Sequence, residues 1–254
     1  MLEGKLGLVT GVANRRSIGW GIGQALAKSG ARLAFTYQER VGDTVNELVA
    51  TLPNAFTLPC EVTEDAQVDE AFDRVEREFG GLDILVHSIA FAPREALENP
   101  FLETSREAWR TAMEISAFSL AQLARKAAPL MEKRGGGSII TMTYLGSDRV
   151  FPKYNVMGVA KAALESTVRY LASDLGPKNI RVNAISAGPI RTLAARSIQG
   201  FPKMEEHVRE IAPLRRNTEA AEVGDVAVFL ASEMSRNVTG ITLFCDSGYH
   251  IMGM

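Results

Sequence analysis

The sequence predicts an α/β protein: a single Rossmann-type, doubly wound domain whose seven-stranded parallel sheet is flanked by helices on both faces. Seven short apolar runs alternate along the chain with longer segments of helical periodicity. Each run is almost continuously apolar, which is typical of strands buried on both faces. Because strand, helix and strand repeat, the connections are expected to be right-handed crossovers between parallel strands.

Thirteen elements are predicted along the chain. The strands are Leu6–Thr10, Arg32–Thr36, Ala55–Leu58, Ile84–Val86, Ser138–Met142, Arg181–Ile185 and Thr242–Cys245. The helices are Gly19–Ser29, Thr44–Thr51, Gln67–Phe79, Arg106–Lys133, Val156–Leu175 and Ala221–Ser232. Pro129, late in the fourth helix, is expected to end or kink it. Ligands of such sheets bind beyond the carboxyl ends of the strands, so the loops that follow the strands should form the site.

Length and composition limit the class of protein. The chain has 254 residues, which we assign to one dinucleotide-binding catalytic domain over residues 1–254. Its net charge of -2 gives no dominant basic surface, so we expect neither a nucleic-acid partner nor an anionic membrane. Cys60 and Cys245 lack motif spacing and predict buried thiols in a reducing compartment. Without a signal-peptide pattern or an apolar run of about 18 residues, a cytoplasmic protein without membrane insertion is expected.

The loop after the first strand has the features of a phosphate-binding turn. Gly11 lets the backbone approach a pyrophosphate closely, and a helix beginning near Ile18 offers free N–H groups. Five residues separate Gly11 from Ser17, so the loop is longer than the G-x-G-x-x-G form. Ser17 is therefore expected to give its hydroxyl to a phosphate.

The ends of the second and third strands predict the cofactor. Gln38 can hydrogen-bond a ribose or adenine edge, and the nearby cation, Arg40, has Glu39 beside it. This favours NADH or NAD over NADPH, since a 2′-phosphate needs an accepting basic group. The third strand ends at Glu61 and Val62, where the adenine is expected. Glu61 either accepts from the adenine amino group or caps the following helix.

The fourth strand leads into His87-Ser88-Ile89-Ala90-Phe91-Ala92-Pro93. No carboxylate has a useful spacing from His87, so we interpret it as a hydrogen-bonded core residue, not as an acid or base. The sequence has neither a metal-ligand cluster nor a Gly-x-Ser-x-Gly elbow, so we expect no metal and no hydrolase.

The strongest candidate for chemistry is Tyr154 with Lys161, and Tyr144 after the fifth strand. Tyr154 and Lys161 are seven residues apart, which on a helix places both on one face. An ammonium beside a phenol is expected to lower the pKa of the phenol and can also bind a ribose hydroxyl. The phenol can then stabilise or protonate an oxyanion formed by hydride arrival. The alternative is a buried tyrosine and a snorkelling lysine with no joint role.

These residues resemble the short-chain dehydrogenase/reductase superfamily over the whole chain. In its commoner branch a tyrosine stands four residues before the lysine and a serine about seventeen before it. Here Met157 and Tyr144 stand at those places. In both departures the chain resembles the divergent branch of bacterial NADH-dependent enoyl-acyl-carrier-protein reductases. That branch is marked by Tyr-x6-Lys and a second upstream tyrosine. The segments Gly11–Ile18, His87–Pro93 and Asn183–Thr192 agree with that branch.

The resemblance implies reduction of a trans-2-enoyl thioester by hydride from NADH, in the last step of each fatty-acid elongation cycle. Negative charge would appear on the thioester oxygen, and Tyr154 would hydrogen-bond that oxygen. Lys161 would hold the nicotinamide ribose, and Tyr144 would have a contributory role near the thioester. Besides the residues given above, the resemblance implies further cofactor-binding residues. They are Ser88, Ile89, Lys161, Ile190, Arg191, Thr192, Leu193 and Ala194. The implied substrate-binding residues are Ala92, Tyr144, Tyr154 and Met157.

The long connection at about residues 191–213 is expected to be a substrate lid. It should cover an acyl chain and become ordered only with cofactor or substrate. The cations in or beside it either meet an acidic acyl carrier protein or form a solvated rim; they are Arg191, Lys203, Arg215 and Arg216.

The apolar segment Thr239–Met254 is expected to lie in a subunit interface. The resemblance implies a homotetramer with dihedral symmetry.

Two other functions are considered. A carbonyl reductase of the same fold is disfavoured, because Met157 cannot donate a proton where that branch has tyrosine. A non-catalytic, nicotinamide-sensing binding protein is disfavoured, because Tyr144, Tyr154 and Lys161 are all present.

Overall fold

A parallel sheet of seven strands forms the centre of the computed structural model, which describes residues 1–192 and 201–253. The strands are β1 (Leu6–Val9), β2 (Arg32–Tyr37), β3 (Phe56–Pro59), β4 (Ile84–His87), β5 (Gly137–Thr143), β6 (Ile180–Ala187) and β7 (Thr242–Cys245). Their order is β3-β2-β1-β4-β5-β6-β7, and every neighbouring pair is parallel. The predicted strands and fold class are confirmed. The strand order reverses between β1 and β4, where such sheets bind nucleotides.

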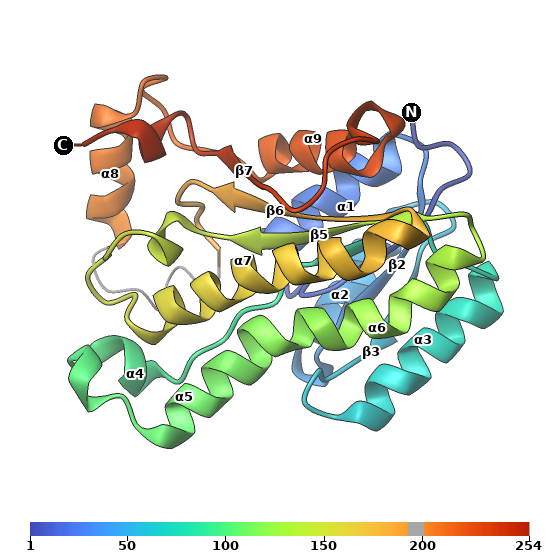
Figure 1. The fold of residues 1–254 in the computed structure, drawn as a ribbon, viewed down its shortest axis with the longest axis horizontal. Helices are drawn as coiled ribbons and strands as arrows, with labels where there is room; N and C mark the ends of the chain where they lie inside the picture. The colour runs from blue at the N-terminus through green and yellow to red at the C-terminus, as the bar shows by residue number, and fades with distance from the viewer. Residues whose placement is uncertain (193–200, 254) are drawn as a thin grey trace.

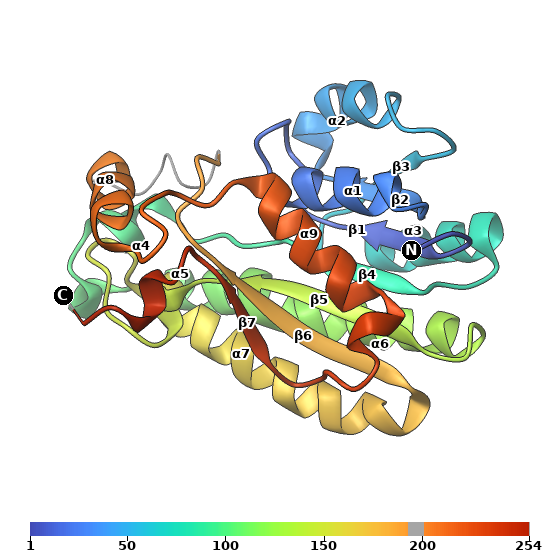
Figure 2. The ribbon, with the colours of Figure 1, turned by 90° about the horizontal axis from the view of Figure 1, so that it is seen from above.

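Helices cover both faces of the sheet (Figures 1 and 2). One face carries α3 (Asp65–Phe79), α6 (Ser119–Glu132) and α7 (Val156–Leu175), and the other carries α1 (Ile18–Lys28), α2 (Gly42–Val49) and α9 (Ala220–Ala231). Each face has its own buried apolar cluster. Burial on both sides explains why the strand sequences are continuously apolar.

The predicted helix Arg106–Lys133 is interrupted by a π-helical segment. It consists of α5 (Arg106–Met113), a π-helical segment η3 (Glu114–Phe118) and α6. Pro129 does not end α6, which continues to Glu132. Proline removes one helical hydrogen bond, but the residues around it are buried, and that packing holds the helix together. The irregularity lies instead at η3, and π-helical turns of this kind are frequent at functional sites.

Several short elements were not predicted. They are α4 (Arg94–Glu98), α8 (Phe201–Ile211) and the 3₁₀ helices η1 (Glu39–Val41), η2 (Phe101–Glu103), η4 (Leu145–Ser147), η5 (Gly176–Lys178), η7 (Glu233–Ser235) and η8 (Tyr249–Ile251). Most are too short to show a helical period. The helix α8 lies within the segment expected to form the lid, so that segment is partly helical. No helix in the described ranges is long and apolar enough to cross a bilayer.

Candidate active site

The loops after β1 and β4 touch where the strand order reverses. Thr10 donates from both its backbone nitrogen and its hydroxyl to the carbonyl oxygen of Val86, at 2.9 and 3.0 Å. Gly11 has φ +79°, and a Cβ at this position would lie 2.0 Å from the backbone oxygen of Ser88. Only glycine fits both the conformation and the space. Two predicted cofactor residues, Gly11 and Ser88, are therefore adjacent.

Ser17 is the N-cap of α1 and shapes the loop before it. Its Oγ accepts hydrogen bonds from the backbone nitrogens of Ala13 (3.0 Å) and Asn14 (3.1 Å). The hydroxyl proton of Ser17 is the part that can still be donated to a ligand, and α1 begins at Ile18. A tight glycine turn followed by a helix N-terminus fits a pyrophosphate, because the helix end is electropositive.

Gln38 joins the ends of β2 and β3. Its Nε2 donates to Glu61 Oε2 at 2.7 Å, and its Oε1 accepts from Arg40 Nε and Nη2 at 3.2 and 2.9 Å. The N-cap of α3 is Glu64, so Glu61 is not the capping acid that was one of its two interpretations. Val62 is buried. Gln38 and Glu61 thus form one polar edge where an adenosine is expected.

His87 is a fully buried core residue, as predicted. Its ring nitrogens pair with the hydroxyls of Thr141 and Ser119, both at 2.8 Å. Burial, followed by the nearby charge of Lys161, lowers the pKa of His87 to about 3. The imidazole is therefore neutral across the physiological range.

We expect this histidine to make the protein less stable in acid. The pKa of a histidine in an unfolded chain is about 6.5, while the folded pKa is about 3, so between these values only the unfolded chain binds the proton. Stability from this group is complete above pH about 6.5 and is lost as the pH falls below it. Urea unfolding near pH 7 and near pH 5 measures the loss. Equal losses in the parent and in His87→Gln would contradict the assignment.

An apolar cluster collects the predicted substrate-binding residues. Tyr154 and Met157 are buried in it, and Tyr144 and Ala92 pack against it. The rings of Tyr144 and Tyr154 meet edge to face, with centroids 5.2 Å apart. All four predicted residues are therefore brought together, although they come from three separate segments.

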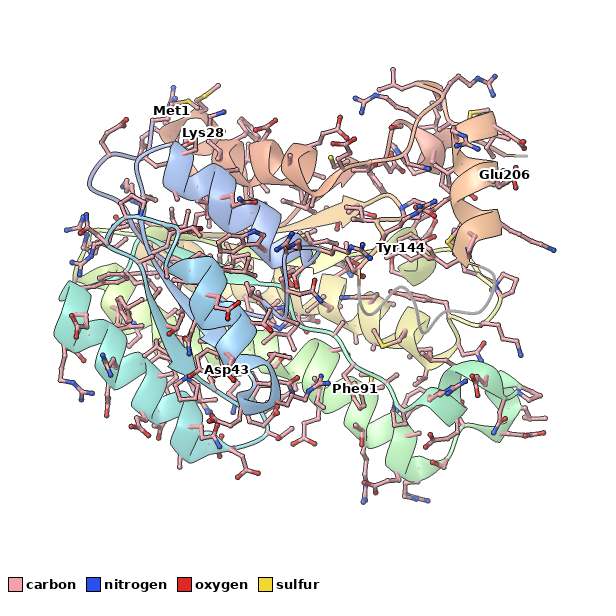
Figure 3. The ribbon with its side chains drawn as sticks, turned by 180° about the vertical axis from the view of Figure 1, so that it is seen from behind. Met1, Lys28, Asp43, Phe91, Tyr144 and Glu206 are labelled. Atoms are coloured by element: carbon pink, nitrogen blue, oxygen red, sulfur yellow. The ribbon has the colours of Figure 1, made fainter. Side chains whose placement is uncertain are left out.

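Two contacts fix the tyrosine rings. A Cβ on Gly146 would lie 2.5 Å from the ring of Tyr154, so the glycine lets that ring pack directly against η4. The hydroxyl of Tyr144 donates to Met204 Sδ of α8 at 3.2 Å. Figure 3 shows Tyr144 at the same end of the molecule as Glu206 of α8, far from Met1 and Lys28.

Tyr154 lies just before α7, not on it. The expectation that Tyr154 and Lys161 share one face of a helix is therefore wrong. The helix begins at Val156, and Asn155 between them has φ +42° and ψ -120°. Such a conformation is strained for any residue with a Cβ. The Asn155 amide donates to three carbonyl oxygens at the end of α4, those of Ala96, Leu97 and Asn99. Asn155 was not predicted; the tolerance of asparagine for positive φ was the available signal.

Lys161 is buried beside the same cluster, and its Nζ donates to the carbonyl oxygen of Met142 at 2.7 Å. Burial lowers the pKa of Lys161 to about 8, and the carboxylate of Glu165 acts in the opposite direction. The pKa of Tyr154 is raised, first by burial and then by Glu165. The expectation that Lys161 lowers the pKa of the phenol is therefore wrong. Tyr154 is a neutral hydrogen-bond donor.

The π-helical segment holds the loop after β4. The hydroxyl of Ser116 accepts from the backbone nitrogen of Phe91 and donates to its carbonyl oxygen, both at 2.9 Å. It also approaches Met157 Sδ at 3.7 Å. Sequence reasoning missed Ser116, because no motif distinguishes one serine in a long helical pattern. The predicted residue Ile89 packs against the α3–α6–α7 cluster.

The segment after β6 reaches α8. Ile190 packs against the cluster on the α1–α9 face, and its carbonyl oxygen accepts from the backbone nitrogen of Thr192 at 2.7 Å. Arg191, predicted to bind cofactor, directs its Nε to both carboxylate oxygens of the buried Glu205, at 2.9 and 2.7 Å. The predicted residues Leu193 and Ala194 lie outside the described residues. No group of three or more potential metal-ligating side chains occurs in the described ranges.

Several known proteins are similar to this chain in sequence and in fold. Residues 11–250 match the family model described as enoyl-(acyl carrier protein) reductase. The chain is 53% identical to the NADH enoyl-acyl-carrier-protein reductase of Nostoc sp., over 100% of this chain and 99% of the relative. The enoyl-acyl carrier protein reductase of Bacillus cereus, solved with NADP+ and indole naphthyridinone, gives a TM-score of 0.97 at 51% identity and coverage of 100% and 99%. The reductase of Anaplasma phagocytophilum with NAD gives 0.95 at 45% identity, covering 100% and 96%.

Proposed function

Since the chain belongs to the enoyl-(acyl carrier protein) reductase family, we propose that it reduces trans-2-enoyl thioesters with NADH through Tyr154, Tyr144 and Lys161. The observation that carries the proposal is the buried cluster in which the two tyrosine rings meet. Met157, which cannot donate a proton, occupies the place of the commoner catalytic tyrosine. The reaction is the last step of each fatty-acid elongation cycle, carried out by one catalytic domain.

The residues of the nucleotide end fit the cofactor. The loop from Gly11 to Ser17 and the N-terminus of α1 receive the pyrophosphate, and Gln38 with Glu61 receives the adenosine. Lys161 binds the nicotinamide ribose. The Nζ of Lys161 already donates to the backbone carbonyl oxygen of Met142. A hydrogen-bond donor for the ribose is therefore present inside the site.

When bound, NADH would supply a hydride to C3 of the enoyl thioester, and a proton added at C2 would complete the reduction. Tyr154 then holds its phenol proton at the thioester oxygen, where negative charge grows in the transition state. The raised pKa of Tyr154 suits this role, because an ionised phenol could only repel that charge. The ring of Tyr144 supports Tyr154 from the edge, and Ala92 and Met157 line the apolar path of the acyl chain.

A direct assay tests this function. The spectrophotometric loss of NADH is followed with a crotonyl thioester and, side by side, with an acetoacetyl thioester. We expect rapid loss with the enoyl substrate alone. Turnover of the ketone alone would assign a carbonyl reductase, and tight NADH binding without turnover would assign a sensing protein.

NADH should be preferred over NADPH. Glu61 is bonded to Gln38 on the edge proposed for the adenosine, so its carboxylate would repel the negative charge of a 2′-phosphate. Arg40 donates to the neutral amide of Gln38 and keeps its charge, so it would offset part of that repulsion. We expect kcat/KM for NADPH to be on the order of 10-fold lower or more, the scale of one charge contact. In Glu61→Gln, kcat/KM for NADH and kcat/KM for NADPH should lie closer together than in the parent. An equal ratio of the two constants in parent and variant would contradict this assignment.

We also propose that residues of about 191–213 form the substrate lid. The contacts of Met204 with Tyr144 and of Glu205 with Arg191 support it, since they join α8 to the site. Met204→Ala should raise KM more for a long enoyl chain than for crotonyl. The same change for both substrates would argue against a lid over the acyl chain.

The carrier protein should dock beside this lid. Arg191 and Arg216 already pair with Glu205 and Glu222, which leaves the exposed Lys203 and Arg215 as the stronger candidates for an acidic partner. Charge reversal at both should raise KM for the carrier-bound substrate and leave a small thioester unaffected. Equal changes for the two substrates would remove this surface from the proposal.

We propose a homotetramer and a cytoplasmic location on the basis of the family. Apolar side chains exposed along the β7 edge and the C-terminal segment, Ile241, Phe244 and Ile251, support an interface there. Light scattering of the purified protein tests the assembly, and a monomer would contradict it.

A further inference from the structure

The catalytic lysine and a carboxylate with no assigned role are tied to the same point of β5. Lys161 donates to the carbonyl oxygen of Met142 at 2.7 Å. The next residue, Thr143, donates from its hydroxyl to Glu165 Oε1 at 2.6 Å. Lys161 and Glu165 are four residues apart in α7 and so are neighbours on one helix face. Two consecutive strand residues thus hold an ammonium and a carboxylate one helical turn apart.

We propose that Glu165 is a positioning residue: held by Thr143, its carboxylate keeps the buried side chain of Lys161 charged and acts on cofactor and substrate only through that lysine. The inference rests on the function proposed above for Lys161. A neutral lysine would lose its positive potential beside the growing enolate and its strongest hold on the ribose.

Burial makes this support necessary. Lys161 is only 5% exposed, and burial lowers its pKa to about 8, while Glu165 raises it. A buried ammonium without a neighbouring carboxylate loses its proton more readily, since desolvation penalises the charged form. Charge–charge attraction is also stronger in this interior than in water. Without Glu165, the lysine should therefore be partly neutral at the pH of the cell.

The other titratable groups around the lysine carry no charge near neutral pH. His87 on β4 has its pKa lowered to about 3. The pKa values of Tyr154, before α7, and Tyr144, after β5, are raised by burial. From α6, Ser119 contributes a hydroxyl, which is bonded to the histidine. In the described part of the chain, the effects on the lysine's pKa are burial and Glu165.

The test is the pH profile of kcat/KM for NADH in Glu165→Gln. In the parent, activity should fall as the pH rises through about 8, where Lys161 loses its proton. Without the carboxylate that pKa is lower, so the alkaline limb should move to lower pH by about one unit. Activity below the shifted limb should stay close to that of the parent. A merely structural role would lower activity by the same factor at every pH.

Two controls sharpen the result. Glu165→Asp keeps the negative charge and should keep the alkaline limb of the pH profile near its position in the parent. Glu132→Gln neutralises an exposed carboxylate on α6 that pairs with Lys178, and should leave the limb unchanged. A parent-like limb in Glu165→Gln, or a pH-independent loss, overturns the proposal.

A second variant covers failure of Glu165→Gln to fold. Thr143→Val removes the hydroxyl that holds the carboxylate, and should give a smaller shift in the same direction; no shift overturns the proposal. Lys161→Met tests the underlying function separately. If it retains parental activity, the role of Lys161 fails, whatever Glu165 does.

Discussion

Tyr154→Phe should lower kcat with an enoyl thioester on the order of 10²-fold, the usual cost of removing one donor to a developing oxyanion. The ring of Tyr154 lies against Gly146 and the edge of Tyr144, so the variant keeps its packing and loses only the hydroxyl. Because the missing bond forms mainly in the transition state, KM for NADH should change little. Steady-state kinetics with a crotonyl thioester measure both constants.

Tyr170→Phe is the matched control, since it removes the hydroxyl of an exposed tyrosine on α7, the helix that follows Tyr154. It should match the parent in both constants. If Tyr154→Phe retains parental kcat, the hydroxyl does not meet the growing charge, and another donor must serve that oxygen.

Gly11→Ala should both destabilise the protein and weaken NADH binding. The new Cβ would lie 2.0 Å from the backbone oxygen of Ser88, and φ is +79°. Left-handed strain and overpacking together should cost about 3 kcal/mol of unfolding free energy. Since the loops after β1 and β4 must move apart, kcat/KM for NADH should fall on the order of 10²-fold, the effect of about 1 Å of misplacement.

Gly80→Ala separates the cost of left-handed backbone strain from the cost of overpacking. Gly80 has φ +72° at the C-terminal end of α3, but a Cβ there meets nothing within 4 Å. Its loss of stability should be about 1 kcal/mol, with NADH binding unchanged. Similar unfolding curves for the two variants would show that contact with Ser88 does not matter. Thermal and urea unfolding give the comparison.

The strands and the nucleotide loop could be predicted because their physical signals are local. A strand buried on both faces is almost continuously apolar, so β4 is visible in the run Ile84–Val86, although the strand continues to His87. Gly11 marks its loop because no other residue fits there. His87 was predicted as a core residue because no carboxylate accompanies it, and its two hydroxyl partners confirm this.

The electrostatics of the site could not be predicted, because they depend on burial and on partners distant in sequence. The spacing of Tyr154 and Lys161 suggested a lowered phenol pKa, but the depth of burial decides the direction, and it raises the pKa. The bond from Gln38 to Glu61 joins two strands that only the sheet order makes neighbours. Glu165 has an ordinary place in a helical pattern, and its partner Thr143 lies on another element.

The contact of the β1 and β4 loops separates two sets of groups that share no hydrogen-bond partner in the described structure. Gln38 and Glu61 lie on the side of β2 and β3, while the substrate-binding candidates Tyr144 and Met157 lie on the side of β5 and α7. Free-energy changes at independent sites add, so substitutions from the two sets should multiply in their effect on rate. Nucleotide preference and acyl-chain chemistry can therefore be redesigned, or diverge in evolution, one without the other.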